Sequence, residues 1–193
     1  MAKIILKNVR INFPRLVVAQ ENRYSQDGRK FYSAQIVIAE DDKENLQKVT
    51  AGIKEAFVAK FGDKAERVFA AAKENKNTRG LQHDTDRQRW YINTKRREEN
   101  GAPIVYSADL KRVLTAQTDM PRSGDYIDVV VQSWCYDASG SKGVSFELVS
   151  IHFRKEGEPF EGSGIRATAD DFEALATPVA ANDDFADELA AFS

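Results

Sequence analysis

The chain has 193 residues, of which 42% are hydrophobic and 30% are charged; this is the composition of an ordinary globular domain and excludes a disordered or collagen-like protein. No apolar run approaches the roughly 20 residues that span a bilayer, and the first residues lack the apolar segment of a signal peptide, so no membrane partner is expected. The lone cysteine, Cys135, cannot form an internal disulfide, which predicts a cytoplasmic protein.

The net charge of −2 hides an uneven distribution of charge along the chain. From Ala167 onward there are seven acidic residues and neither Lys nor Arg, so 28 basic residues face 23 acidic ones in the first 166 positions and give them a net charge of +5. A basic body with an acidic tail is typical of proteins with nucleic-acid partners. We therefore expect a folded domain over residues 1–160 and a flexible acidic tail over 161–193.

Alternating apolar and polar residues predict two strands near the N-terminus, over 3–13 and 31–39. Pro14 should end or kink the first strand, because proline cannot donate to a β-ladder. The first strand should place four apolar side chains on one face: Ile5, Val9, Ile11 and Phe13.

A helical segment is predicted at about 42–73. Asp41 or Asp42 can cap its N-terminus, and Gly62 can end a first helix before a second one. Four apolar residues recur at helical spacing in the first helix: Leu46, Val49, Ile53 and Phe57. We expect these helices to act as scaffold.

The most basic segment follows, over 73–97, with Trp90 and Tyr91 near its centre. Residues 75–87 are almost devoid of apolar side chains and predict a loop, and 90–94 predict a short strand. Cations interleaved with aromatic rings suit single-stranded nucleic acid, since phosphates need charge and bases need flat faces. The alternative is a solvated loop with Trp90 in the core. Adjacent strand residues point oppositely, so only one of the two rings should reach a ligand.

A long antiparallel hairpin is predicted from two runs of β-branched and aromatic residues, 126–136 and 144–154, around the small and polar residues 137–143. Trp134 and Tyr136 share a strand face with polar side chains. They form either a stacking platform for unpaired bases or a cap on the core. With a further short strand at 103–106, the strands and the helical insert predict a small β-barrel.

Enzyme motifs are missing from the sequence. There is no phosphate-binding glycine loop, nucleophile elbow or HExxH pair. His83, His152 and Cys135 are too few for a convincing zinc site, so no cofactor or metal is expected. Two acidic pairs, Asp41 with Asp42 and Asp84 with Asp86, leave a metal-dependent nuclease as one alternative.

Three stretches carry a resemblance to a known family: the opening LKNVRINFPRL followed by FYSAQIVIAEDD, the hairpin GDYIDVVVQSWCYDASGSKGVSFELVSIHF, and the acidic tail with an aromatic residue near its end. In this order they resemble the phage-encoded single-stranded-DNA-binding proteins. The resemblance implies a mainly β OB-fold, a five-stranded antiparallel Greek-key barrel, with a basic and aromatic groove. It implies sequence-nonspecific DNA binding in phage replication and recombination, without catalysis, in the host cytoplasm; a homo-oligomer is compatible with it.

In that family the acidic tail recruits replication or recombination proteins and competes with DNA for the groove. The residues that match the tail by type are Asp183, Asp184, Asp187, Glu188 and Phe192. The same segment can instead form a short amphipathic helix on a partner, because Phe185, Leu189 and Phe192 recur at helical spacing.

We predict two sets of groove residues. Those expected to stack on bases are Tyr24, Tyr32, Trp90, Tyr91, Tyr106, Trp134 and Tyr136. Those expected to meet phosphates are Arg29, Lys30, Arg89, Lys95, Arg96, Lys111 and Arg112. The main rival function is a protein-interaction module, such as a structural phage β-barrel, in which the tail is the working part.

Overall fold

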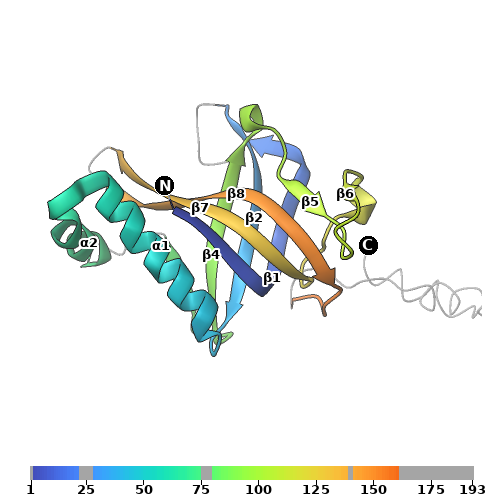
Figure 1. Ribbon diagram of the computed structural model, residues 1–193, viewed down its shortest axis with the longest axis horizontal. Helices are drawn as coiled ribbons and strands as arrows, with labels where there is room; N and C mark the ends of the chain where they lie inside the picture. The colour runs from blue at the N-terminus through green and yellow to red at the C-terminus, as the bar shows by residue number, and fades with distance from the viewer. Residues whose placement is uncertain (1, 22–27, 75–79, 139–140, 161–193) are drawn as a thin grey trace, which may run out of the picture. The chain divides into compact units, whose positions relative to one another are not determined.

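The computed structural model describes residues 2–21, 28–74, 80–138 and 141–160. The chain divides into two units, Met1–Ser163 and Gly164–Ser193, and every described residue lies in the first (Figure 1). In chain order the elements are β1 (Ala2–Glu21), β2 (Lys30–Ala39), α1 (Lys43–Phe61), η1 (Gly62–Lys64), α2 (Ala65–Glu74), β3 (Leu81–Asp84), β4 (Arg89–Arg97), η2 (Glu98–Asn100), β5 (Ile104–Tyr106), β6 (Val113–Leu114), η3 (Gln117–Asp119), β7 (Tyr126–Ala138) and β8 (Ser141–Lys155).

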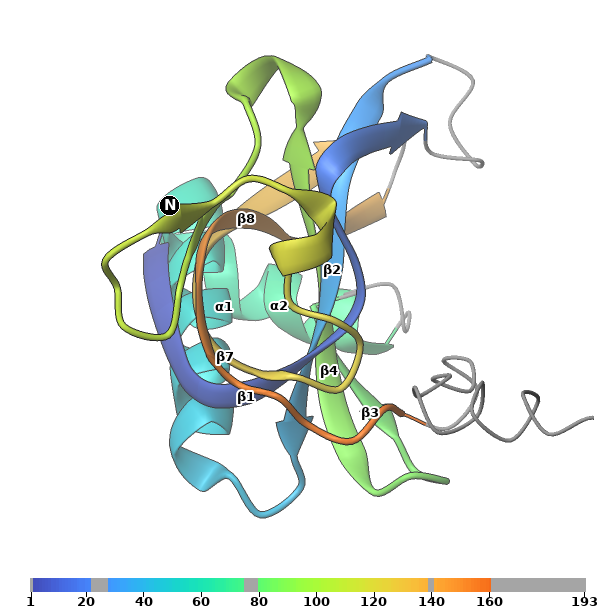
Figure 2. The ribbon, with the colours of Figure 1, turned by 90° about the vertical axis from the view of Figure 1, so that its right-hand side faces the viewer.

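Five of the strands close into a barrel, in the order β1, β2, β4, β8, β7 and back to β1 (Figure 2). Four of the junctions are antiparallel, and the barrel closes through a short parallel pairing of β4 with β8, where Thr94 lies opposite Phe146. This is the five-stranded Greek-key arrangement of the OB-fold. The predicted fold class is confirmed, including the helical insert, which lies between the second and third barrel strands.

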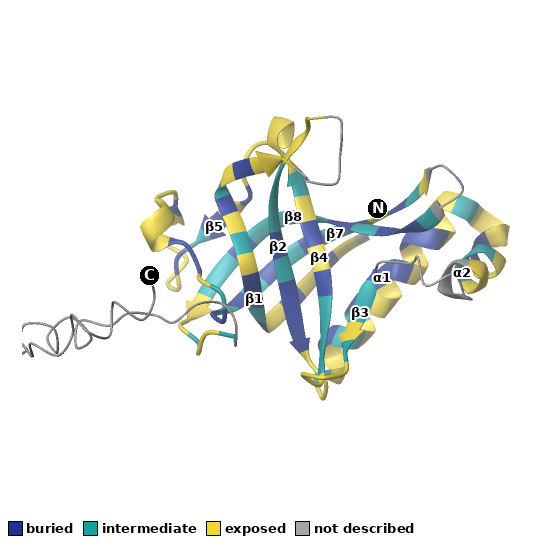
Figure 3. Cartoon of the chain, turned by 180° about the vertical axis from the view of Figure 1, so that it is seen from behind, coloured by how far each residue is buried: buried dark blue, intermediate teal, exposed yellow. Residues whose placement is uncertain are grey.

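The barrel interior is filled by side chains from alternate strand positions. Ile36, Ile92 and Leu148 are fully buried, as are Leu6 and Ile127. The alternation of buried and exposed residues along β4 is visible in Figure 3. Burial of several large aliphatic side chains, each worth about 1.5–3 kcal/mol, fixes which face of each strand turns inward.

Two irregularities in β1 change its predicted faces. The register of β1 shifts between Leu6 and Val9 against β7 and between Asn12 and Arg15 against β2. Ile4 and Leu6 are therefore buried while Ile5 is 45% exposed. Phe13 is also turned outward, so the expectation that Ile5 and Phe13 share a face with Val9 and Ile11 was wrong, because each bulge breaks the two-residue period.

The helical insert packs along β1 and β7. Val49, Ile53 and Phe57 are buried as predicted. The backbone of α1 comes so close to β1 that a Cβ at Gly52 would overlap the side chain of Ile4. Across the same contact, the Ser133 hydroxyl donates to the Gly52 carbonyl over 2.9 Å.

Asp42 begins α1, as one of the two predicted caps. Its carboxylate accepts from the Asn45 backbone N–H over 3.1 Å and from the Asn45 side-chain amide over 2.6 Å. Asn45 is itself buried and donates to the Lys7 carbonyl over 2.8 Å, which ties the start of α1 to β1.

Replacing Asp42 by alanine should therefore lower the free energy of unfolding by about 1–2 kcal/mol, the upper part of the range for a lost cap. Urea denaturation measures the difference. The exposed neighbour Asp41 provides the matched control, since Asp41→Ala should cost less than about 0.5 kcal/mol. Equal effects of the two substitutions would contradict the capping role.

Two predictions about local structure need correction. Residues 81–84, predicted as part of a loop, form β3, which pairs with β4 alone at an edge of the sheet. An edge strand with little buried surface does not need apolar residues, so the pattern gave no signal. The predicted seven-residue turn at 137–143 is also too long, because β7 continues to Ala138 and β8 begins at Ser141.

Within the described ranges, no helix combines the length and the apolar character that crossing a bilayer requires.

Candidate nucleic-acid interface

Polar side chains occupy part of the outer face of β2 and β4. Paired side chains on the outer face are Ser33 with Lys95 and Gln35 with Asn93. These positions are exposed or half-buried, whereas the intervening Ala34 and Ile36 are buried. In OB-folds this face of the second and third strands is a recurrent site for oligonucleotides.

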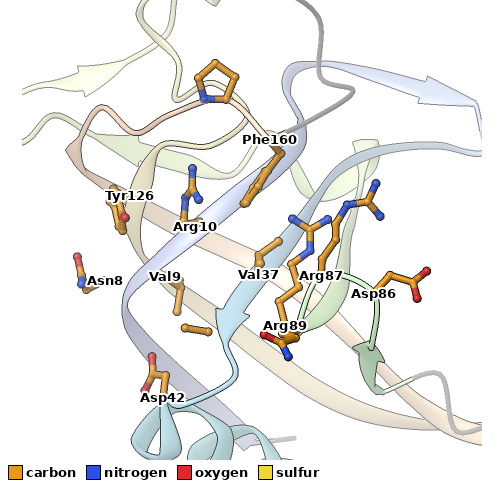
Figure 4. Close-up of a pocket in the computed structure, with 13 residues that line it drawn as sticks. Asn8, Val9, Arg10, Val37, Asp42, Asp86, Arg87, Arg89, Tyr126 and Phe160 are labelled. Carbon is orange, nitrogen blue, oxygen red and sulfur yellow. The ribbon is translucent and has the colours of Figure 1, made fainter.

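Three neighbouring cavities on this side of the barrel share lining residues, and we call them together the groove. The cavity that we call the aromatic end has a volume of about 840 Å³ and shares Phe13 and Gln35 with a middle cavity of about 450 Å³. The middle cavity shares Arg87 and Arg89 with a third of about 800 Å³, the arginine end (Figure 4).

The aromatic end is lined by Phe13, Arg15, Lys95, Trp134 and Tyr136. Trp134 is 40% exposed, and its ring meets that of Tyr136 edge-on with 6.3 Å between centroids. Both rings lie on the β7 face opposite the buried Ser133 and Cys135. Of the two readings of this hairpin, the structure favours presentation of Trp134 toward the groove over a cap on the core.

Phe13 is a groove residue that the sequence pattern missed. It is 62% exposed and adopts a positive φ of 48°, a costly conformation for a residue with a bulky side chain. The side chain of the buried Asn12 holds Phe13 in this conformation. Its Oδ1 accepts from the Phe13 backbone N–H over 3.1 Å, and its Nδ2 donates to the Gln35 side chain over 3.0 Å. Strain of this kind collects at functional sites. The feature of the sequence that could have identified Phe13 is its position as an aromatic residue directly before Pro14.

The basic side chains of the groove differ in how firmly they are held. Lys95 is exposed, with its ammonium 5.8 Å from the Phe31 ring centroid. Arg89 is mostly buried and bonds to the Asp84 carboxylate over 3.2 Å. Burial alone would raise the pKa of Asp84, but hydrogen bonds from Arg87 and Arg89 and their positive charges lower it below its usual value. The carboxylate therefore keeps its charge and keeps Arg89 in place.

Trp90 and Tyr91 lie on opposite faces of β4, as the alternation of side chains along a strand predicts. Tyr91 lines the middle cavity, and its hydroxyl donates to Gln82 over 2.7 Å. Trp90 is half-buried against the core, with its ring 4.3 Å from that of His83 between centroids.

The groove brings together five of the predicted site residues: Arg89, Tyr91, Lys95, Trp134 and Tyr136. Arg96 is turned to the opposite face of β4, where it bonds to Glu147 over 2.9 Å and to two backbone carbonyls. The other described members that do not line the three cavities are Arg29, Lys30, Tyr32, Trp90, Tyr106, Lys111 and Arg112. Tyr24 and the tail residues Asp183, Asp184, Phe185, Asp187, Glu188, Leu189 and Phe192 lie outside the described residues.

The residues considered for a metal site or a nuclease take part in local structure or are held uncharged. Asp42 caps α1 and Asp84 bonds to arginine, as described above. Burial raises the pKa of the Cys135 thiol to about 11, which keeps it protonated at neutral pH. In the part of the chain that the structure describes, no three acidic, histidine or cysteine side chains gather as a metal site would require.

A five-stranded OB barrel with an open groove that combines exposed aromatic rings and cations defines a protein of the oligonucleotide-binding class. Comparison with known proteins places the chain more closely. Residues 2–186 match the family model described as the single-stranded-DNA-binding protein of Enterobacter phage Enc34, and the chain belongs to that family. The family is one of DNA-binding proteins, so the expectation that the chain is not an enzyme is confirmed, as is the predicted phage family.

A curated relative and two solved structures illustrate the match. Putative protein p50 of Acyrthosiphon pisum secondary endosymbiont phage 1 is 30% identical over 181 residues, which cover 90% of this chain and 94% of the relative. The C-terminally truncated single-stranded DNA-binding protein of bacteriophage Enc34 is 18% identical, with a TM-score of 0.59 over 82% of this chain and 88% of that one. The same phage protein in complex with single-stranded DNA gives a TM-score of 0.55 at 18% identity over 82% and 89%.

Proposed function

We propose that this protein binds single-stranded DNA without sequence preference along the groove between the aromatic end and the arginine end. The observation that carries the proposal is the gathering of Phe13, Trp134 and Tyr136 with Arg15 and Lys95 in one open cavity. The solved complex of a family member with single-stranded DNA supports it.

The roles of the groove side chains follow from the chemistry of single-stranded DNA. Phe13, Tyr91, Trp134 and Tyr136 would stack on bases, and every base offers a π-face, so stacking does not select a sequence. Arg15 and Lys95 would neutralise phosphates and release counterions, which makes affinity depend steeply on salt. Three exposed cations that do not line the cavities would add positive charge that attracts the DNA strand without fixing it: Lys30, Lys111 and Arg112.

Titration with oligo(dT) and with duplex DNA of equal length, each at two salt concentrations, tests the proposal. Tight binding of oligo(dT) that weakens with salt, together with weaker binding of duplex, is the expected result. Preference for duplex, or binding of neither, would reject it and favour a protein-interaction module. Magnesium-dependent loss of the oligonucleotide, abolished by a chelator, would instead identify a nuclease.

We further propose a role in phage DNA replication and recombination, in which the acidic tail over 161–193 recruits partner proteins and competes with DNA for the cationic groove. The support is the charge distribution, since the seven acids after Ala167 oppose a net charge of +5 in the preceding residues.

Deletion of residues 180–193 should therefore tighten oligo(dT) binding at low salt, and the gain should shrink as salt screens the charges. Fluorescence anisotropy of a labelled oligonucleotide measures both. A variant with the four acids of this segment changed to amides (Asp183→Asn, Asp184→Asn, Asp187→Asn and Glu188→Gln) keeps the length of the chain and should reproduce the gain. Unaltered or weaker binding by both variants would exclude competition by the tail.

A further inference from the structure

The arginine end of the groove holds an aromatic ring from the chain itself. Phe160 lies between two guanidinium groups, with its ring centroid 4.2 Å from the Cζ atom of Arg10 and 4.6 Å from the Cζ atom of Arg89 (Figure 4). Arg10 comes from β1, Arg89 from β4, and Phe160 follows the end of β8. Three segments far apart in the sequence thus build a slot that holds one aromatic ring.

The two cations are oriented by hydrogen bonds at their edges, and Arg10 also lies over the Tyr126 ring, with its Cζ atom 5.4 Å from the ring centroid. The Arg10 Nε donates to the Gly124 carbonyl over 2.9 Å, and its Nη2 donates to the Glu158 carbonyl. The Arg89 Nε donates to Asp84 over 3.2 Å. A guanidinium held in this way offers a flat cationic face, and such faces stack on nucleobases as well as on phenyl rings.

A nucleotide can offer this cavity a charged contact that Phe160 lacks. Its base can occupy the same space between Arg10 and Arg89, and its phosphate brings a negative charge beside Arg87, which lines the same cavity. A phenyl ring brings no such charge. Phe160 has the advantage of being tethered, so it fills the slot when no DNA competes.

The tether of Phe160 is short and local. The Gly157 N–H donates to Asp125 over 3.1 Å, and a Cβ at Gly157 would collide with the Gly124 carbonyl, so the chain is pinned at that point. Pro159 and Phe160 lie beyond the pin and outside regular secondary structure. A movement of these few residues would empty the slot.

We propose that the slot between Arg10 and Arg89 is a nucleobase subsite of the groove, which Phe160 fills in the protein without DNA and vacates when single-stranded DNA binds. This proposal rests on the proposed function. It concerns a ring of the barrel unit and not the charges of the acidic tail.

The test compares oligo(dT) binding by the full-length wild type and the Phe160→Ala variant. Removal of a competitor from the slot should tighten binding on the order of fivefold. Phe61→Ala is the matched control, because Phe61 also lies beside a cation, with its ring centroid 5.4 Å from Lys142, but lines none of the three cavities. The control should bind like the wild type. Gly157→Ala, which loosens the pin and keeps every slot residue, should also tighten binding.

Unchanged binding by Phe160→Ala would overturn the subsite, and weaker binding would show that Phe160 is itself a stacking ring. If the wild type binds and Trp134→Ala weakens binding while Phe160→Ala does not strengthen it, the subsite alone is rejected. If the wild type fails to bind oligo(dT), the proposed function and the subsite fail together. A fluorine label on the Phe160 ring gives a direct readout. Its NMR signal should move to the position of an exposed ring at saturating oligo(dT), and an unmoved signal would reject displacement.

Discussion

Replacing Trp134 by alanine is expected to weaken oligo(dT) binding about tenfold or more, since loss of one base–aromatic stack costs about 1–3 kcal/mol. Trp134 is the most suitable ring for this test because it is 40% exposed and lines the aromatic end. Its side chain contributes little to the core, so the barrel should remain folded. Anisotropy titration gives the dissociation constant, and a thermal melt shows whether the fold is intact.

Trp90→Phe is the matched control for that substitution. Trp90 lies on the inner face of β4 beside His83, and phenylalanine keeps most of its packing. Binding by this variant should equal that of the wild type. If Trp90→Phe lost affinity while Trp134→Ala kept it, the groove would be assigned to the wrong face of the sheet.

The Arg15→Gln and Lys95→Gln double variant is expected to show the second large effect, a shallower dependence of affinity on salt. Each phosphate contact with single-stranded DNA contributes about 0.7 to the slope of log K against log salt, so the slope should fall by about 1.4. The loss of affinity should be greatest at low salt. Titrations at about four or more salt concentrations measure this slope.

A control with the same change of net charge separates local contacts from the general field. Lys54 and Lys64 are exposed on the helical insert and do not line the three cavities. Lys54→Gln with Lys64→Gln should leave the slope nearly unchanged. Equal slopes for the two double variants would mean that Arg15 and Lys95 do not contact phosphates.

Much of the fold was predictable because several segments follow simple periodicity. The alternation in 31–39 and 126–136 matches β2 and β7, and the helical spacing with Asp42 and Gly62 as caps matches α1. Pairing between distant strands could not be predicted in this way. The parallel contact of β4 with β8, which closes the barrel, leaves no local mark in either strand.

The candidate site was predictable where the strand period held and was missed where it broke. Trp134 and Tyr136 reach the groove because β7 alternates regularly through both of them. Phe13 was assigned to the same face as Val9 and Ile11, because a bulge at Asn12 with a left-handed residue after it cannot be predicted from alternation. Arg96 was assigned to phosphates because the sequence shows its charge but not the face of the barrel that it occupies. It directly follows Lys95 in β4, so the two side chains point to opposite faces.

The slot at the arginine end could not be predicted from the sequence. Arg10, Arg89 and Phe160 belong to three segments that meet only after the barrel has closed. No spacing rule connects residues so far apart, and each residue taken alone has an ordinary type for its position.

The most direct measurement of binding in the groove is the tryptophan fluorescence of the Trp90→Phe variant, whose remaining tryptophan is Trp134. Stacking of bases on this ring should quench its emission in proportion to the bound oligo(dT), and added salt should restore the emission. Full emission from Trp134 at oligo(dT) concentrations that saturate binding by anisotropy would contradict a groove built around this residue.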